Sequence, residues 1–331
     1  MAKSNTARSQ GAAVAAQQRH IQRAQDARDR ARAHKRSAAG GAVQAGARAQ
    51  PVELPAQHLA KPGDEADLEL EPRFLAPDYQ GSGKLEGMVA IVTGGDSGIG
   101  RAVAVLFARE GADVAILYLS EHADARRTQR FVQAEGRRCL VIAGDVKDSA
   151  FCRKAVDRVV REFGGLHVLV NNAAFQEHAQ ALEDITDERF DETMRTNVYG
   201  YFHMARAAVR HLKRGGSIIN TGSVVGLEGS PSLLDYSTTK GAIHAFTKAL
   251  AQNLASRAIR VNAIAPGPVW TPLNPADKPA EKVAAFGRDT DMKRVAQPEE
   301  LSPAYVFLAS PVCSSYITGI VLPVTGSVGA I

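Results

Sequence analysis

The sequence predicts an α/β fold in which one parallel β-sheet is covered by helices on both faces. Short apolar runs recur along residues 84–331, and a helix-length stretch separates each run from the next. Runs without polar alternation are typical of strands that are buried on both faces of a sheet. The 331 residues are 45% hydrophobic, which is enough apolar material for a sizeable core.

The predicted strands follow one another in a regular order. The first is Met88–Thr93, and a helix that ends at Gly111 comes after it. Six further runs predict strands at Val114–Tyr118, Cys139–Ala143, Val168–Val170, Ser217–Asn220, Arg260–Ile264 and Gly319–Pro323. Because crossovers of this length join parallel strands, residues 84–331 are predicted to form one domain.

A formal net charge of +5 is compatible with a nucleic-acid partner, but the charge is unevenly distributed along the chain. Residues 1–50 carry ten Lys or Arg against two Asp, and residues 51–83 carry two against seven acidic residues. Residues 84–331 carry 28 basic and 26 acidic residues. The basic charge therefore lies in the N-terminal tail, and nucleic acid is not an expected partner of the body.

The two N-terminal segments differ in composition. Residues 1–50 are rich in Ala, Arg and Gln and contain no aromatic residue, which predicts an extension with at most a transient helix. A solvated extension, an organellar targeting segment and a polyanion-binding arm all stay open for it. Residues 51–83 contain five prolines and end in Gly-Ser-Gly, which predicts an extended arm or linker.

Cysteine usage and hydropathy indicate the compartment. Cys139, Cys152 and Cys313 lie far apart and form no CxxC pair, which argues against a disulfide framework and a zinc site. No apolar run approaches the roughly 18 residues of a membrane span, and no secretory segment is visible. We expect a cytoplasmic protein that contacts no membrane and needs no metal.

A glycine-rich motif follows the first predicted strand directly. Residues 93–100 read Thr-Gly-Gly-Asp-Ser-Gly-Ile-Gly and open a helix. Glycines let backbone amides approach a pyrophosphate, and the helix N-terminus adds partial positive charge. No Gly-Lys-Ser/Thr follows, so the motif predicts a dinucleotide cradle and not a Walker site.

A tyrosine, a lysine and a serine form a second motif. Tyr236 and Lys240 have the i, i+4 spacing of one helix face. A neighbouring ammonium is expected to lower the pKa of the phenol, which suits proton transfer to an alkoxide. Ser223 follows the predicted strand Ser217–Asn220, at the sheet edge where ligands bind, and its hydroxyl can polarise a carbonyl.

Together these motifs resemble the short-chain dehydrogenase/reductase family over about residues 81–326. The similarity is greatest to a bacterial subset with a Pro-rich arm and the same glycine-rich motif. The resemblance implies a Rossmann-type, doubly wound sheet of about seven strands in the order 3-2-1-4-5-6-7. It also implies an NAD(P)-dependent enzyme that transfers a hydride between nicotinamide and an alcohol/carbonyl substrate, with a tyrosine as general acid/base.

The resemblance assigns the site residues. Its catalytic set is Ser223, Tyr236, Lys240 and Asn197, the last holding a water on the proton relay. The implied cofactor contacts are Gly94, Asp96, Ser97, Ile99, Gly100, Tyr118, Leu119, Asp145, Val146, Asn172, Ala173, Tyr236, Lys240, Pro266, Gly267, Val269 and Thr271. The implied substrate wall is Phe175, Gln176, Val224, Leu227 and Trp270, with a lid over residues 272–294. Such a wall suits a small or medium, mostly apolar compound.

Cofactor choice depends on the end of the second strand. Tyr118 stands where an acidic residue would select NAD, and Leu119 follows it. Arg101 could pair with a 2′-phosphate, which favours NADP, or it could be a solvated helix residue. The family also implies a homodimer or homotetramer.

A competing function is a non-catalytic NAD(P) sensor with a partner-binding basic tail. The complete Ser223, Tyr236 and Lys240 set argues against it. If the body alone is the enzyme, deletion of residues 1–80 leaves activity in place.

Overall fold

The strands of the described chain form one parallel sheet of seven, in the order β3-β2-β1-β4-β5-β6-β7. Both the parallel sheet and its predicted strand order are thereby confirmed. The strands are β1 (Val89–Thr93), β2 (Asp113–Tyr118), β3 (Cys139–Ala143), β4 (Val168–Asn171), β5 (Ser217–Thr221), β6 (Arg260–Pro266) and β7 (Val321–Val324). From β1 the chain adds β2 and β3 on one side of the sheet, and it then adds β4 to β7 on the other side. At such a switch point the loops after β1 and β4 run in opposite directions and leave a crevice.

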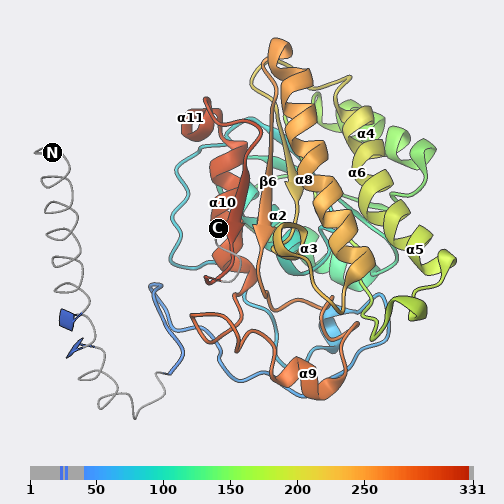
Figure 1. Ribbon diagram of the computed structural model, residues 1–331. Helices are drawn as coiled ribbons and strands as arrows, with labels where there is room; N and C mark the ends of the chain where they lie inside the picture. The colour runs from blue at the N-terminus through green and yellow to red at the C-terminus, as the bar shows by residue number, and fades with distance from the viewer. Residues whose placement is uncertain (1–22, 25–26, 29–40, 328–331) are drawn as a thin grey trace, which may run out of the picture. The chain divides into compact units, whose positions relative to one another are not determined.

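The computed structural model describes residues 23–24, 27–28 and 41–327 (Figure 1). From Val43 onward the described chain belongs to one compact unit, separate from the unit Met1–Ala42. Three hypotheses were given for residues 1–50: a transient helix, a targeting segment and a polyanion-binding arm. They concern residues that lie mostly outside the described ones.

Helices cover both faces of the sheet (Figure 1). One face carries α2 (Gly98–Arg109), α3 (His122–Ala134) and α10 (Pro298–Ala309), and the other carries α4 (Ser149–Phe163), α6 (Gly200–Ala208) and α8 (Leu234–Leu254). Shorter helices are α5 (Asp187–Met194), α7 (Val225–Glu228), α9 (Ala280–Ala284) and α11 (Pro311–Ser314), with a π-helical turn at Arg195–Tyr199 and 3-10 turns at Glu65–Asp67, Leu182–Asp184 and Ala255–Arg257.

Alternation along β1 explains the two layers. Ala90 and Val92 pack into the cluster beneath α2 and α10, whereas Val89 and Ile91 pack into the cluster beneath α4 and α6. Successive side chains of a strand point to opposite faces, so a strand between two helix layers must be apolar throughout.

The N-terminal arm, here residues 43–83, differs from the predicted linker. Leu54, Leu59 and Leu68 are each 8% exposed and pack against Trp270 and the α9 region. Figure 1 shows the blue arm along the same edge of the unit as α9. The arm therefore belongs to the catalytic unit, whose boundary lies near residue 43 and not near residue 84. The prolines prevent regular structure without preventing burial of the leucines between them.

Candidate active site

A pocket of about 490 Å³ lies at the carboxyl ends of the strands. Loops after β1 to β6 line it, together with the start of α8 and part of the lid. The lining contains most of the predicted residues, namely Gly94, Asp96, Ser97, Ile99, Tyr118, Leu119, Asp145, Val146, Asn172, Ala173, Phe175, Gln176, Ser223, Val224, Tyr236, Lys240, Pro266, Gly267, Val269 and Thr271.

The glycine-rich loop is shaped for close approach of a ligand. Gly94 and Gly98 have φ values of +60° and +49°, in the left-handed region that favours glycine. A Cβ at Gly94 would lie 3.0 Å from Cα of Ala173, and a Cβ at Gly100 would lie 1.9 Å from the Gly94 oxygen. Gly100 is outside the lining and instead lets the loop fold tightly against α2. This cradle suits the dinucleotide that the motif predicts.

Side chains also hold the loop against the end of β4. Thr93 Oγ1 accepts from the backbone N–H groups of Asn172 and Ala173 at 2.9 and 3.1 Å. Asn172 Nδ2 donates to the Gly94 oxygen at 3.1 Å. The two walls of the crevice are therefore fixed to each other before any ligand enters.

Three of the four predicted catalytic residues, Ser223, Tyr236 and Lys240, line the pocket. Lys240 Nζ lies 5.2 Å from the centre of the Tyr236 ring and donates to the Thr221 oxygen at 2.8 Å. Ser223 Oγ accepts from Val225 N at 3.3 Å, and it is also a hydrogen-bond partner of Tyr236. The loop after β5, which carries Ser223, and the start of α8, which carries Tyr236 and Lys240, thus bring all three groups to one place.

The pKa of the tyrosine differs from the prediction. Burial raises the pKa of Tyr236 above its ordinary value of 10.0, and the charge of Asp277 raises it further, while the hydrogen bond with Ser223 opposes both. Burial also lowers the pKa of Lys240 to about 7. The ammonium that was expected to lower the pKa of the phenol is itself costly to charge at this depth.

Asn197 lies behind the pocket wall and not in it. Its side chain accepts from the backbone N–H of Phe175 at 2.8 Å and donates to the Phe175 oxygen at 2.9 Å and to Thr239 Oγ1 at 3.0 Å. The residue sits in the π-helical turn and is fully buried. It ties the segment after β4 to α8.

Three predicted side chains lie elsewhere. Trp270 is fully buried beneath the arm and donates Nε1–H to the Leu70 oxygen at 2.8 Å, because it follows pocket-lining Val269 in extended backbone and points the opposite way. Leu227 is 42% exposed on α7, outside the lining. Arg101 is fully buried and pairs with Glu65 and Asp124, so it is neither solvated nor placed for a 2′-phosphate.

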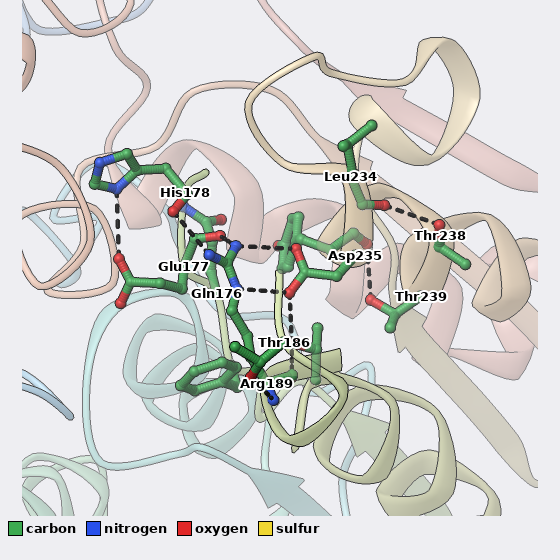
Figure 2. Close-up of polar contacts among 12 residues, drawn as sticks. Gln176, Glu177, His178, Thr186, Arg189, Leu234, Asp235, Thr238 and Thr239 are labelled. Carbon is green, nitrogen blue, oxygen red and sulfur yellow. Dashed lines mark hydrogen bonds and ion pairs between the residues drawn. The ribbon is translucent and has the colours of Figure 1, made fainter. Parts of the chain in front are cut away.

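Phe175 and Gln176 form one wall of the substrate end, and this wall continues outside the pocket lining to His178. Figure 2 shows Arg189 of α5 between this wall and Asp235: it donates to the backbone oxygens of Glu177 and His178 and pairs with the buried Asp235 carboxylate at 3.2 Å. Arg189 therefore fixes the wall relative to Tyr236, the next residue along α8.

On its other side this wall contacts the lid. Gln176 Nε2 donates to Asp277 Oδ2 at 2.5 Å, and His178 Nδ1 lies 2.9 Å from Asp277 Oδ1. These bonds hold the pKa of Asp277 below its ordinary value despite its burial. The ligand atoms of Glu177, His178 and Asp277 lie within 4.8 Å of one another, but Lys61 of the arm already pairs with Glu177 at 3.0 Å.

Comparisons with known proteins agree with this geometry. Residues 94–328 match a family model described as enoyl-(acyl carrier protein) reductase. The chain is 52% identical over 277 residues to general stress protein 39 of Bacillus subtilis, covering 83% of this chain and 96% of that one. It is 49% identical over 276 residues to NADPH-dependent aldehyde reductase 1 of Arabidopsis thaliana, covering 82% and 96%.

A short-chain dehydrogenase from Burkholderia cenocepacia, solved with NADP, superimposes with a TM-score of 0.69 at 35% identity, over 74% of this chain and 98% of that one. This chain belongs to the short-chain dehydrogenase/reductase family. Solved structures of the family carry NADP, NAD or NADH. The protein is an NAD(P)-dependent oxidoreductase, and the non-catalytic alternative is not favoured. Among the described residues, none of the helices combines the length and the apolar character that crossing a bilayer requires.

Several residues around the dehydrogenase site had no sequence signal. Pro62 and Gly63 of the arm line the pocket, and Asp277 and Arg189 hold the wall from opposite sides. The excess of acidic residues over residues 51–83 was the one hint that the arm has charged partners in the body.

Proposed function

We propose that Tyr236 is the proton donor of this oxidoreductase. We further propose that the enzyme reduces small or medium, mostly apolar aldehydes and ketones at neutral pH. The observation that carries the proposal is the meeting of Tyr236, Lys240 and Ser223 in one buried pocket. Burial raises the pKa of the phenol, so it is protonated at neutral pH and can act as an acid.

The proposed cofactor contacts follow the crevice. The glycine-rich loop holds the pyrophosphate, residues near Tyr118 and Asp145 hold the adenosine, and Pro266–Thr271 meets the nicotinamide. When bound in its reduced form, the nicotinamide supplies the hydride that a carbonyl carbon accepts.

The residues of this chain handle the carbonyl oxygen. Ser223 donates a hydrogen bond to it, which stabilises the developing negative charge. Tyr236 transfers its proton to that oxygen and leaves an alcohol. Lys240 lies beside the phenol and, when protonated, stabilises the phenolate that remains. Asn197 keeps Phe175 and Thr239 in register, and the relay water assigned to it stays a prediction.

The substrate class is inferred from the pocket. Phe175, Val224, Leu233 and Phe286 supply apolar surface at the catalytic end. The amide nitrogen of Gln176, a residue of the predicted substrate wall, donates to Asp277. The name of the Arabidopsis relative, an aldehyde reductase, supports the same class.

A panel of aldehydes, ketones and sugars, followed by oxidation of reduced cofactor, tests this substrate class. We expect kcat/KM for apolar aldehydes and ketones to exceed that for sugars at least about tenfold. Turnover of sugars alone would refute the proposed class.

We propose NAD(H) as the preferred cofactor, which reverses the NADP preference drawn from the sequence. Arg101 is buried in an ion pair, and Asp96 and Glu121 line the pocket near the end of β2. Glu121 disfavours an additional phosphate and can accept from ribose hydroxyls. Burial and the charge of Glu121 raise the pKa of Asp96 to about 7, so Asp96 carries only part of a negative charge at neutral pH. Fluorescence titration with NADH and NADPH should give the lower Kd for NADH, and Glu121→Gln should narrow the difference; tighter NADPH binding contradicts this.

We propose a cytoplasmic homo-oligomer, a dimer or a tetramer. Phe190, Tyr199 and Phe202 are 42, 51 and 44% exposed on the segment from α5 to α6, and such an aromatic surface suits a subunit contact. The three cysteines are free, as in a reducing compartment. Light scattering after size exclusion should give a multiple of 35.2 kDa, and Phe202→Glu should lower it.

A further inference from the structure

We propose that the turn Lys61–Glu65 of the arm is part of the active site, with Glu65 positioning the cofactor loop and Lys61 positioning the substrate wall. The inference rests on the dehydrogenase activity described above. It concerns residues outside the stretch 94–328 that matches the family model.

Glu65 contacts the start of the helix that follows the glycine-rich loop. Its carboxylate accepts from the backbone N–H of Gly98 at 2.7 Å and pairs with Arg101, and the residue is only 2% exposed. An acidic group at the N-terminus of α2 stabilises this end of the helix, which carries a partial positive charge. Its own backbone N–H donates to Asp124 of α3 at 2.6 Å, which fixes the turn in place.

Arg101 carries this contact into the cofactor loop. Its Nε and Nη2 donate to the backbone oxygen of Asp96 at 3.0 and 2.6 Å. Asp96 and its neighbour Ser97 line the pocket. Loss of the Glu65 carboxylate would leave the buried guanidinium without its main counter-charge, and the loop that it holds would lose its fixed position.

Lys61 acts at the other end of the turn. Its ammonium donates to the backbone oxygens of Gln176 at 2.7 Å and Ala276 at 2.9 Å, and it lies 5.3 Å from the centre of the Phe175 ring. The ion pair with Glu177 completes its contacts. Lys61 therefore joins the wall after β4 to the lid.

The turn between Lys61 and Glu65 packs closely against the lid. Gly63 lines the pocket with a φ of +96°, and a Cβ there would lie 3.0 Å from Cβ of Ala276. The Leu59 N–H donates to the Pro275 oxygen at 2.9 Å. Arm and lid thus contact each other at Leu59, just before the turn, and at Gly63, within it.

Glu65→Gln tests the cofactor half of the proposal. The control is Glu71→Gln, since Glu71 also pairs an arm carboxylate with an arginine of the body, Arg127, but is half exposed and does not line the pocket. We expect Glu65→Gln to raise the Kd of NADH roughly tenfold while kcat at saturating NADH changes less than about twofold. The control should leave the Kd within about twofold of the wild type.

Glu65→Asp gives a second reading if the glutamine variant does not fold. It keeps the charge and shortens the side chain, so it should also weaken NADH binding. Equal Kd values for the Glu65 and Glu71 variants would overturn the proposal, and so would tighter NADH binding without the carboxylate. Binding of NADH to the wild type needs no substrate, so this outcome is independent of the substrate class.

Lys61→Met tests the substrate half. We expect KM for a carbonyl substrate to rise at least about fivefold while the Kd of NADH stays within about twofold. Lys84→Met is the matched control, because Lys84 is also ion-paired and equally exposed, at 31%, but pairs with Glu110 away from the pocket. An unchanged KM in Lys61→Met, or the same rise in both variants, would overturn this half.

Discussion

Lys240 Nζ lies 5.2 Å from the centre of the Tyr236 ring, and both groups are buried. Burial acts on them in opposite directions: it raises the pKa of the phenol and lowers that of the ammonium to about 7. The unliganded pair therefore favours its uncharged forms, and a protonated phenol is the form that a carbonyl reduction needs.

The Lys240 charge should cost stability at low pH. Below about pH 7 the folded and unfolded states both hold this proton, so the folded state carries the full cost of a buried charge. Between about pH 7 and 10.5 the unfolded state binds more protons, so the free energy of unfolding rises with pH as this cost is removed.

Lys240→Met should therefore raise the Tm of the cofactor-free protein by roughly 5 °C at about pH 6, and the gain should shrink towards about pH 10. Circular dichroism melts across this range measure it. Lys248→Met, at an exposed position of the same helix, should change Tm little. A lower Tm for Lys240→Met at acidic pH would show that the charge stabilises the fold.

The two directions of the reaction should respond differently to pH. Alcohol oxidation needs the phenolate, and burial raises the pKa of Tyr236, so its rate should rise about tenfold per pH unit between about pH 7 and 9. Carbonyl reduction uses the protonated phenol and should change less than about threefold. Steady-state rates in both directions decide this; a plateau of oxidation below about pH 8 would mean that the phenol titrates near neutrality.

Removal of the arm should abolish activity. The sequence alone had suggested that activity would remain after this deletion. Deletion of residues 1–80 removes Leu54, Leu59 and Leu68 from their contact with Trp270. It also removes the contacts of Glu65 with Gly98 and of Lys61 with the backbone of Gln176. We expect NADH binding and turnover to be lost. Deletion of residues 1–42 keeps the arm and should leave kcat/KM within about twofold; an active 1–80 deletion would refute the role of the arm.

The sheet and the catalytic pair could be predicted because each has a local signature. A strand buried on both faces must be apolar at every position, as β1 is, and a helix places residues four apart on one face, as it does Tyr236 and Lys240. The strand order followed from the family resemblance, and the sheet confirms it.

The arm and the charge states could not be predicted in the same way. Leu54, Leu59 and Leu68 follow no helical or strand period, so nothing local indicates their burial. The spacing of Tyr236 and Lys240 shows that they are neighbours, but their pKa values depend on depth, which only the tertiary structure sets.

Arg101 shows the same limit. Its counter-charge, Glu65, lies 36 residues away in the sequence. Arg101 therefore forms an ion pair with the arm, although its position in the sequence suits a contact with a 2′-phosphate.

The role of Tyr236 as proton donor is tested most directly by single-turnover oxidation of bound NADH by a carbonyl substrate in Tyr236→Phe. We predict a rate at least about a hundredfold below the wild type, with the Kd of NADH within about twofold. Tyr305→Phe, which removes a buried hydroxyl bonded to Thr221 Oγ1 at 2.8 Å, is the control and should keep the wild-type rate. A Tyr236→Phe rate within about threefold of the wild type would contradict the assignment of Tyr236 as proton donor.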